Sequence, residues 1–142
     1  MQNNIICSGA LFYSTSTKRF LFLQRTDFKT KGTWGLVGGR MRYTESAFEG
    51  LKREIQEEIG ETSRFKKIIP LEMFTSNDLK FYFHTYLIAI ENEFVPKLNK
   101  EHSGYAWCNF ECWPKNLHAG LKNTLNNKSI KGKLQTILDL II

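Results

Sequence analysis

The sequence predicts an α/β fold of the mixed, α+β kind, in which one β-sheet is sandwiched between helices. β-Prone segments occur before, between and after two or three helical segments, without the regular strand–helix alternation of a doubly wound sheet. The 142 residues, 42% of them hydrophobic and 13% aromatic, suffice for one core and leave little room for a second. We therefore expect a single domain over residues 1–142.

The first strands come from apolar, β-prone segments that are separated by polar turns. Residues 5–13 and 19–23 flank the polar turn 14–17, and this arrangement predicts a β-hairpin. A charged loop at 27–32 follows. A short strand at 34–37 is then expected to stop at the pair Gly38-Gly39.

The second half of the chain predicts three more strands and two C-terminal helices. Strands are expected at 68–75, 79–90 and 105–108, with a polar loop at 91–101. Helices are expected at 114–125 and 130–142. The last one has apolar residues at helical spacing: Ile130, Leu134, Ile137, Leu138 and Ile141.

The helix after Gly38-Gly39 carries the most information about function. Ser46 and Glu49 have the spacing of a capping box, so we start this helix at Ser46 and end it at Gly60. With residues placed about 100° apart, one face is apolar: Phe48, Leu51, Ile55 and Ile59. A neighbouring arc is acidic: Glu54, Glu57, Glu58 and Glu61. Gly50 lies in the same arc, where we expect it to remove a side chain that would crowd the carboxylates.

Like charges on one helical stripe repel each other, and a divalent cation converts that repulsion into coordination. The oxygen ligands are hard and include no histidine, so we expect Mg²⁺ or Mn²⁺ rather than zinc. Arg53 is within reach of Glu49 and Glu57 and is expected to hold a carboxylate in place. A solvated acidic surface is the simpler interpretation, and composition alone does not decide between the two.

The net charge of +6 and the pI near 9.3 favour a polyanionic partner. Five lysines and no acid lie between residues 113 and 133, whereas six glutamates lie between residues 41 and 61. A cation site inside a field that attracts anions fits this distribution. The lysine-rich stretch lacks interleaved aromatic residues, so we do not expect it to be a nucleic-acid scaffold.

No segment predicts secretion or a membrane span. The apolar run 81–90 contains His84 and is too short to cross a bilayer, and residues 1–4 are polar and uncharged, unlike a signal peptide. The cysteines Cys7, Cys108 and Cys112 form no even disulfide framework, which fits a reducing compartment. We therefore expect a soluble, cytoplasmic protein without a membrane partner.

Residues 39–61 resemble the Nudix box, Gx5Ex7REUxEExGU, in which U is aliphatic. Gly39, Glu45 and the run 53–60 fill every defined position except the last, where Glu61 replaces an aliphatic residue. The resemblance covers roughly residues 5–121. Other departures are Val37 where proline is frequent, and Arg42 and Thr44 where an acid and a glycine are frequent.

The resemblance implies a Nudix-type fold and a metal-dependent hydrolase that cleaves a nucleoside diphosphate linked to another group. It also implies roles for individual residues. The metal ligands would be Glu54, Glu57, Glu58 and the carbonyl of Gly38, and the orienting pair would be Glu45 and Arg53. The candidates for the general base are Glu54, Glu57 and Glu101, and Glu54 is favoured because it lies on the Gly50 side, where the acidic stripe is least crowded. Glu101 follows a polar loop and is expected to reach the site only when that loop closes.

Several substrates are compatible with the resemblance: nucleoside triphosphates, nucleotide sugars, ADP-ribose and dinucleoside polyphosphates. The expected partner is a nucleotide-type small molecule. Nucleic acid is expected only as a 5′-end or cap substrate, and a homodimer is left open. The base-stacking candidates are Trp34, Tyr43, Phe81, Tyr82 and Trp107.

The alternative is a catalytically inactive Nudix-fold module that binds nucleotide or RNA. A retired site has no need of all four box residues Arg53, Glu54, Glu57 and Glu58, and all four are present. Their presence therefore favours the enzyme.

Overall fold

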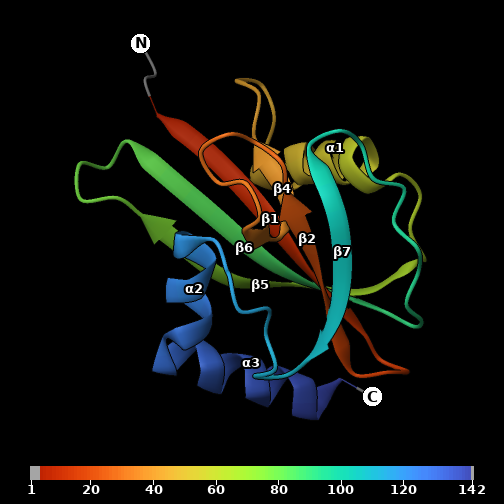
Figure 1. The fold of residues 1–142 in the computed structure, drawn as a ribbon. Helices are drawn as coiled ribbons and strands as arrows, with labels where there is room; N and C mark the ends of the chain where they lie inside the picture. Colours follow the sequence, from red (N-terminus) through yellow and green to blue (C-terminus); the bar gives the residue numbers. More distant parts are fainter. Residues whose placement is uncertain (1–3, 142) are drawn as a thin grey trace.

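The computed structural model describes residues 4–141, which form a seven-stranded mixed β-sheet with helices on both faces (Figure 1). The predicted sandwich is confirmed. In chain order the elements are β1 (Ile5–Ser14), β2 (Arg19–Arg25), β3 (Trp34–Gly35), β4 (Val37–Arg40), α1 (Ala47–Ile59), β5 (Phe65–Thr75), β6 (Phe81–Ile90), β7 (His102–Asn109), α2 (Ala119–Asn126) and α3 (Lys128–Leu140).

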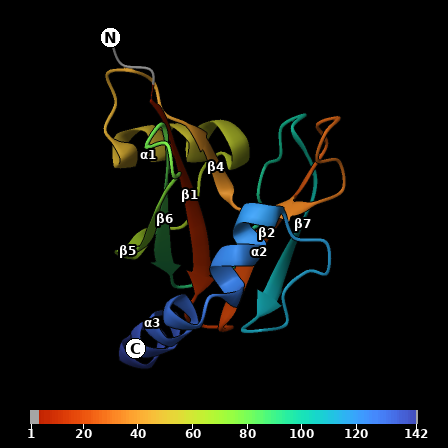
Figure 2. The ribbon, with the colours of Figure 1, turned by 90° about the vertical axis from the view of Figure 1, so that its left-hand side faces the viewer.

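The sheet is split along part of its length. β1 runs parallel to β6 from the Ile5–Phe81 pair to its other end, and β5 continues the sheet as an antiparallel edge. On its other side, β1 pairs with β2 only at Tyr13–Phe20 and at the next residue pair. Beyond these pairs β4 replaces β2 beside β1, while β2 pairs with β3 and β7. The two halves therefore diverge from a shared end (Figure 2).

Each face of the sheet buries a separate apolar cluster, because successive side chains of a strand point to opposite faces. Ala10 and Phe12 of β1 pack in the cluster that includes Leu51, Ile55 and Ile59 of α1. Leu11 and Tyr13 pack in the other cluster with α2 and α3, mainly through Leu121, Leu125 and Leu134. A fully buried Leu or Phe side chain contributes about 1.5–3 kcal/mol, so both layers hold the sheet firmly.

The predicted boundaries of α1 are confirmed. Ser46 is the N-cap, its hydroxyl accepts from the Glu49 amide, and the Glu49 side chain accepts from the Ser46 amide. Gly60 ends the helix at a φ of 74°, which favours glycine because it has no Cβ. The predicted apolar face is also confirmed, since Leu51, Ile55 and Ile59 are buried.

The expectation that the strand at 34–37 stops at Gly38 is wrong. The strand is interrupted at Leu36 instead, between β3 and β4. Both glycines lie inside β4, opposite Gly9 and Ser8 of β1. A Cβ on Gly38 would overlap the Ser8 carbonyl oxygen. Here glycine allows two strands to approach closely rather than ending one of them.

The predicted start of the first C-terminal helix is also wrong, because α2 begins at Ala119 rather than at residue 114. The Trp34 amide donates to Asn116, and the His118 amide donates back to Trp34, so residues 116–118 are held as an extension of the sheet. The last predicted helix is confirmed as α3, although residue 142 lies outside the described residues. Among residues 4–141, no helix is both long and apolar enough to span a bilayer.

Candidate active site

Arg53 of α1 joins three carboxylates and one carbonyl. Its Nε and Nη2 donate to the two oxygens of Glu45 at 2.6 and 2.9 Å. Its Nη1 donates to Glu54 at 2.9 Å and to Glu57 at 3.2 Å, and its Nη2 also reaches the Arg40 carbonyl at 3.2 Å. The hydrogen bonds from Arg53 lower the pKa of Glu45 to about 2. The side chains of Arg53, Glu45 and Glu54 are each less than a fifth exposed, so this network is largely shielded from water.

The structure corrects two expectations about the neighbours of Arg53. Glu49 caps the helix, and the carboxylate that accompanies Glu57 on Arg53 is Glu45 rather than Glu49. Gly50 does not face the metal-ligand candidates, because a Cβ there would meet Met41 and, at 3.0 Å, an oxygen of Glu45. Gly50 therefore leaves room for Met41 and Glu45.

The Glu54 carboxyl lies directly over Gly39. A Cβ built on Gly39 would stand 2.6 Å from an oxygen of Glu54, so only glycine leaves this carboxyl its place. Burial raises the pKa of Glu54, with further contributions from the charges of Glu57 and Glu101. The charge of Glu101 thus acts on Glu54, although 47 positions separate the two residues in the sequence.

Glu58 points inward rather than into solvent with the other acids. Its side chain is buried, with 5% of the residue exposed, and it accepts a 2.9 Å hydrogen bond from the Gly38 amide. Burial raises the pKa of Glu58 to about 8, and the charges of Glu54 and Glu101 add to this effect. The contact seen at Gly38 involves its amide, whereas the carbonyl was the predicted ligand.

The segment that carries Glu101 is already attached to the body of the protein. Arg19 holds Glu93 with hydrogen bonds of 2.6 and 2.7 Å, and Phe94 packs edge-on against Phe12 and Trp107. The Glu101 carbonyl accepts from the Thr26 amide at 3.0 Å. The main chain at Glu101 is thus attached to the end of β2, and Asn99 joins it to α1.

The carboxylates fit a hard cation in chemistry, although they are now engaged with protein donors. Within residues 4–141, no three His, Cys, Asp or Glu side chains form a group that could hold a metal. Glu54 and Glu57 are bonded to Arg53, and Glu58 to Gly38. Burial, and after it the charges of Glu54 and Glu101, disfavour ionisation of Glu58, and a cation bound beside it would favour the ionised form.

Sequence reasoning missed two residues at this site. Arg25 forms a 3.0 Å ion pair with Asp27, and its charge acts on Glu58 and on His102. A basic residue at the end of the predicted strand 19–23 was a usable signal. Asn99 bridges α1 and Glu101, and a side-chain contact between such distant segments leaves no signal in the sequence.

The base-stacking candidates differ in their surroundings. Trp107 and Trp34 pack against the two apolar clusters, so they serve the core. Tyr43 is 85% exposed on the loop before α1. Phe81 packs with Phe74 and Phe83 at ring-centre distances of 6.2 and 6.4 Å, near the β5–β6 turn.

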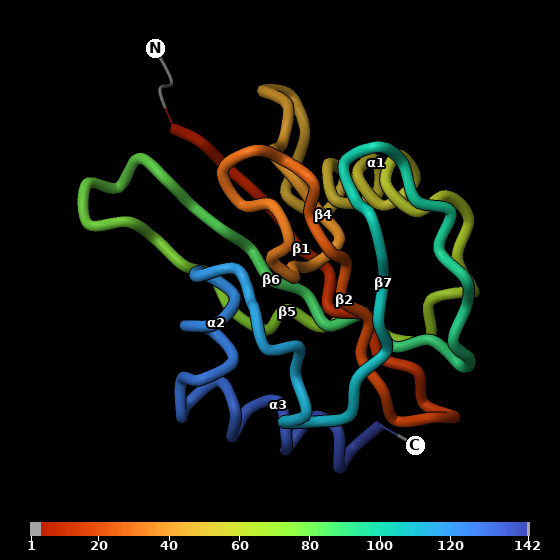
Figure 3. Tube along the Cα trace, viewed as in Figure 1, coloured from red at the N-terminus to blue at the C-terminus, as the bar shows by residue number. Residues whose placement is uncertain are grey.

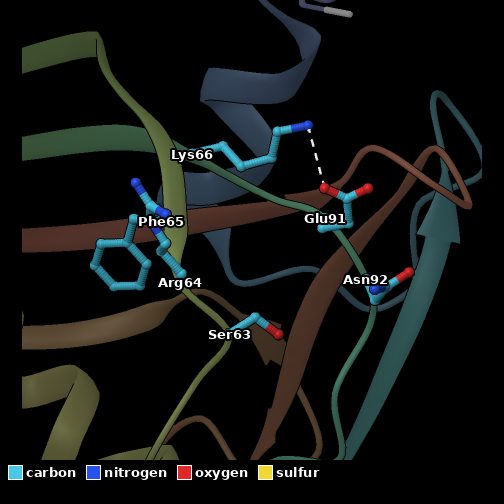
Figure 4. A pocket seen from close by; sticks show the side chains of 6 residues that line it. All are labelled: Ser63, Arg64, Phe65, Lys66, Glu91 and Asn92. Atoms are coloured by element: carbon cyan, nitrogen blue, oxygen red, sulfur yellow. Dashed lines mark ion pairs between the residues drawn. The ribbon is translucent and has the colours of Figure 1, made fainter.

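The surface has two open hollows near the end of α1 and the start of β5. One, of about 460 Å³, lies between residues 63–66 and 91–92 and contains a 3.6 Å ion pair between Lys66 and Glu91 (Figure 4). It includes none of the predicted site residues. The other, of about 670 Å³, lies beside the end of α1 and is lined by Gln56, Glu57, Gly60, Glu61, Lys97, Leu98 and Asn99.

A split mixed sheet with a capped, carboxylate-bearing helix over a Gly-Gly strand defines the class of protein: the Nudix fold. A family model for the NUDIX domain matches residues 6–127, and the chain belongs to this family. Nudix hydrolase 6 of Arabidopsis thaliana is 35% identical over 63 residues, which are 43% of this chain but only 22% of that protein. The chain therefore spans a small part of this relative's length.

Solved structures show the same fold over nearly the whole chain. A MutT protein from Methanosarcina mazei has a TM-score of 0.69 and 25% identity, covering 93% of this chain and 96% of that one. An Ap4A hydrolase from C. elegans has a TM-score of 0.70 and 20% identity, covering 95% of this chain and 99% of that one.

Proposed function

We propose that this protein is a metal-dependent hydrolase that cleaves a phosphoanhydride bond of a nucleoside diphosphate derivative. The observation that carries the proposal is the contact of two α1 carboxylates with the glycines of β4: Glu54 lies over Gly39, and Glu58 accepts from the Gly38 amide at 2.9 Å. Hydrolysis of a phosphoanhydride needs neutralised phosphate charge, a positioned water and a base. The basic remainder of the chain, with a net charge of +6, favours the approach of such an anion.

Glu54, Glu57, Glu58 and the Gly38 carbonyl are the residues that would hold Mg²⁺ or Mn²⁺. When bound, the cation would supply charge neutralisation and make its water more acidic. Arg53 and Glu45 act on this set by orientation, because Arg53 already fixes Glu54 and Glu57 against the helix. Gly39 supports this assignment, because the absence of a side chain there leaves room for the Glu54 carboxyl beside β4.

Glu101 is the general base in this proposal. Glu54 and Glu57 each accept from Arg53, whereas no side chain of the described residues donates to the Glu101 carboxylate. Glu101 is exposed, and its charge reaches Glu54 and Glu58. It can therefore take a proton from a water that lies among these carboxylates.

The substrate is a nucleotide-type small molecule. The Ap4A hydrolase with the same fold places dinucleoside polyphosphates among the compounds to test, beside nucleoside triphosphates, ADP-ribose, nucleotide sugars and capped RNA. A hydrolysis screen with Mg²⁺ and with Mn²⁺, in which both products are identified by ion-exchange chromatography, tests the proposal.

The free thiols of Cys7, Cys108 and Cys112 support a cytoplasmic location.

Activity is expected to disappear in excess EDTA and to return when Mg²⁺ or Mn²⁺ is restored. The reason is that the clustered carboxylates leave the phosphate charge without a neutralising partner once the cation is removed. Product release is followed with and without chelator, and calorimetry reports nucleotide binding in both conditions. Full turnover in EDTA contradicts the mechanism, and tight nucleotide binding without turnover in any condition identifies a binding module instead.

Gly39→Ala is expected to weaken Mn²⁺ binding by roughly 10–100-fold, the usual effect of disturbing groups that orient metal ligands. The added methyl would displace the Glu54 carboxyl, whose oxygen stands 2.6 Å from it. Mn²⁺ titration followed by electron paramagnetic resonance measures the change. Gly132→Ala is the matched control, because nothing lies within 4 Å of its Cβ. An unchanged Mn²⁺ titration for Gly39→Ala would remove Glu54 from the ligand set.

A further inference from the structure

The chain that returns from β6 caps the end of α1. The last carbonyls of a helix have no partner within the helix. The Gly60 amide donates to the Gln56 carbonyl, and the Lys97 amide donates to the Ile59 carbonyl at 3.0 Å. The Asn99 side chain donates to the Glu57 carbonyl at 3.2 Å. Figure 3 shows this stretch running past α1 before it enters β7. Residues 97–99 are therefore attached to the end of the helix that bears the carboxylates.

Asn99 uses both ends of its side-chain amide. Its Nδ2 donates to the Glu57 carbonyl, and its Oδ1 accepts from the Glu101 amide at 2.9 Å. Its own carbonyl accepts from the His102 amide at 3.3 Å. One side chain thus joins the main chain of α1 to the main chain at Glu101.

The opposite side of Glu101 is attached to the end of β2. The Thr26 amide donates to the Glu101 carbonyl at 3.0 Å, and the Thr26 hydroxyl donates to the Lys100 carbonyl at 2.7 Å. The next residue, His102, is buried with 9% exposed and pairs with Arg25 in the sheet. The backbone of Glu101 is thus held from two sides, while its carboxylate stays exposed.

We propose that Asn99 is a positioning residue, which sets the distance between Glu101 and the carboxylates of α1. This inference rests on the proposed function of Glu101 as the base. The position requires a donor and an acceptor on one short, planar group, and asparagine supplies both. Aspartate would keep the acceptor for the Glu101 amide and lose the donor to Glu57.

The bridge can be removed without unfolding the protein. Both of its hydrogen bonds are exposed, and Asn99 lines the open hollow beside α1, so water can replace its amide. Asn99→Ala is expected to lower kcat by roughly 10–100-fold, because small displacements of a catalytic group have effects of this size. KM should change little. Asn99→Asp should lose less than Asn99→Ala, since it retains the contact to Glu101.

A double-mutant cycle with Glu101→Gln separates positioning from a general structural effect. If Asn99 acts through Glu101, Asn99→Ala should lower kcat no further in the Glu101→Gln background. Losses that multiply in full would overturn the proposal, and so would an unchanged kcat for Asn99→Ala alone. Asn92→Ala is the matched control, because this exposed asparagine of the same loop lines the other hollow (Figure 4).

Hydrogen exchange at the Glu101 amide supplies a readout that does not depend on turnover. Asn99→Ala should speed this exchange severalfold and leave the amides of β1 and β6 unchanged. Unchanged exchange at Glu101 would overturn the inference even if kcat falls. Faster exchange in a protein that hydrolyses none of the compounds screened would instead show that the proposed function fails while the contact exists, and the catalytic role of Asn99 would fall with that function.

Discussion

Glu101→Gln is expected to lower kcat by about 10²–10⁴-fold, the usual contribution of a general base. Glutamine keeps the shape and removes the charge that takes the proton. The Glu101 main chain makes the contacts that hold it, so the folded structure should be unchanged. Initial rates at saturating substrate measure the loss, and Mn²⁺ titration should be almost unaffected.

Glu54→Gln distinguishes the competing assignment of the base. If Glu54 is a metal ligand, Glu54→Gln should weaken Mn²⁺ binding and lower turnover together. Glu61→Gln is the matched control, because Glu61 is exposed just beyond the end of α1. If Glu101→Gln reduces kcat less than tenfold and Glu54→Gln reduces it by orders of magnitude, the base is on the helix and Glu101 is not.

Arg53→Met is expected to destabilise the protein by about 3 kcal/mol and to remove most of the activity. It deletes charge-assisted hydrogen bonds to Glu45, Glu54 and Glu57, each worth about 1.5–3 kcal/mol at most, and leaves the largely buried Glu45 and Glu54 without a partner. Partial exposure and reorientation of these carboxylates keep the total well below the sum. Urea denaturation gives the free energy of unfolding, and Arg53→Lys should recover only part of it, because lysine cannot bridge several groups at once.

Arg42→Met is the control for Arg53→Met. The side chain of Arg42 is 67% exposed and makes one 3.8 Å ion pair, with Glu57, so its replacement should change the free energy of unfolding by less than about 0.5 kcal/mol. Equal losses for the two substitutions would show that Arg53 acts only as a surface charge. A stable, fully active Arg53→Met would remove Arg53 and Glu45 from the proposed site.

Local signals predicted the parts of the molecule that depend on near neighbours. Ser46, Glu49 and Gly60 set the limits of α1 through contacts within the helix itself, so their spacing was sufficient. The contact between Arg53 and Glu45 was anticipated by the resemblance to the Nudix box, because the pattern fixes both positions.

Long-range contacts decided what the sequence could not predict. Gly38 and Gly39 lie in a strand because they pair with β1. The sequence around them shows only two glycines after apolar residues, a local pattern that indicates the end of a strand. Helical spacing placed Glu58 on the acidic stripe, but the neighbouring strand buries it. The side-chain contacts of Asn99 depend on Glu57 in α1 and on Glu101 just before β7 at the same time.

The short pairing between β1 and β2 has a consequence for where damaging substitutions should occur. The proposed metal ligands belong to α1 and to β4 on one side of the split, whereas Glu101 precedes β7 on the other. Tyr13–Phe20 joins the two sides at the closed end, and Asn99 joins them beside the carboxylates. Between these two points the sides share a buried cluster, in which Leu21 and Leu23 of β2 pack with Leu51 of α1. Substitutions in this shared cluster, and not only those at the carboxylates, should therefore shift Glu101 relative to α1.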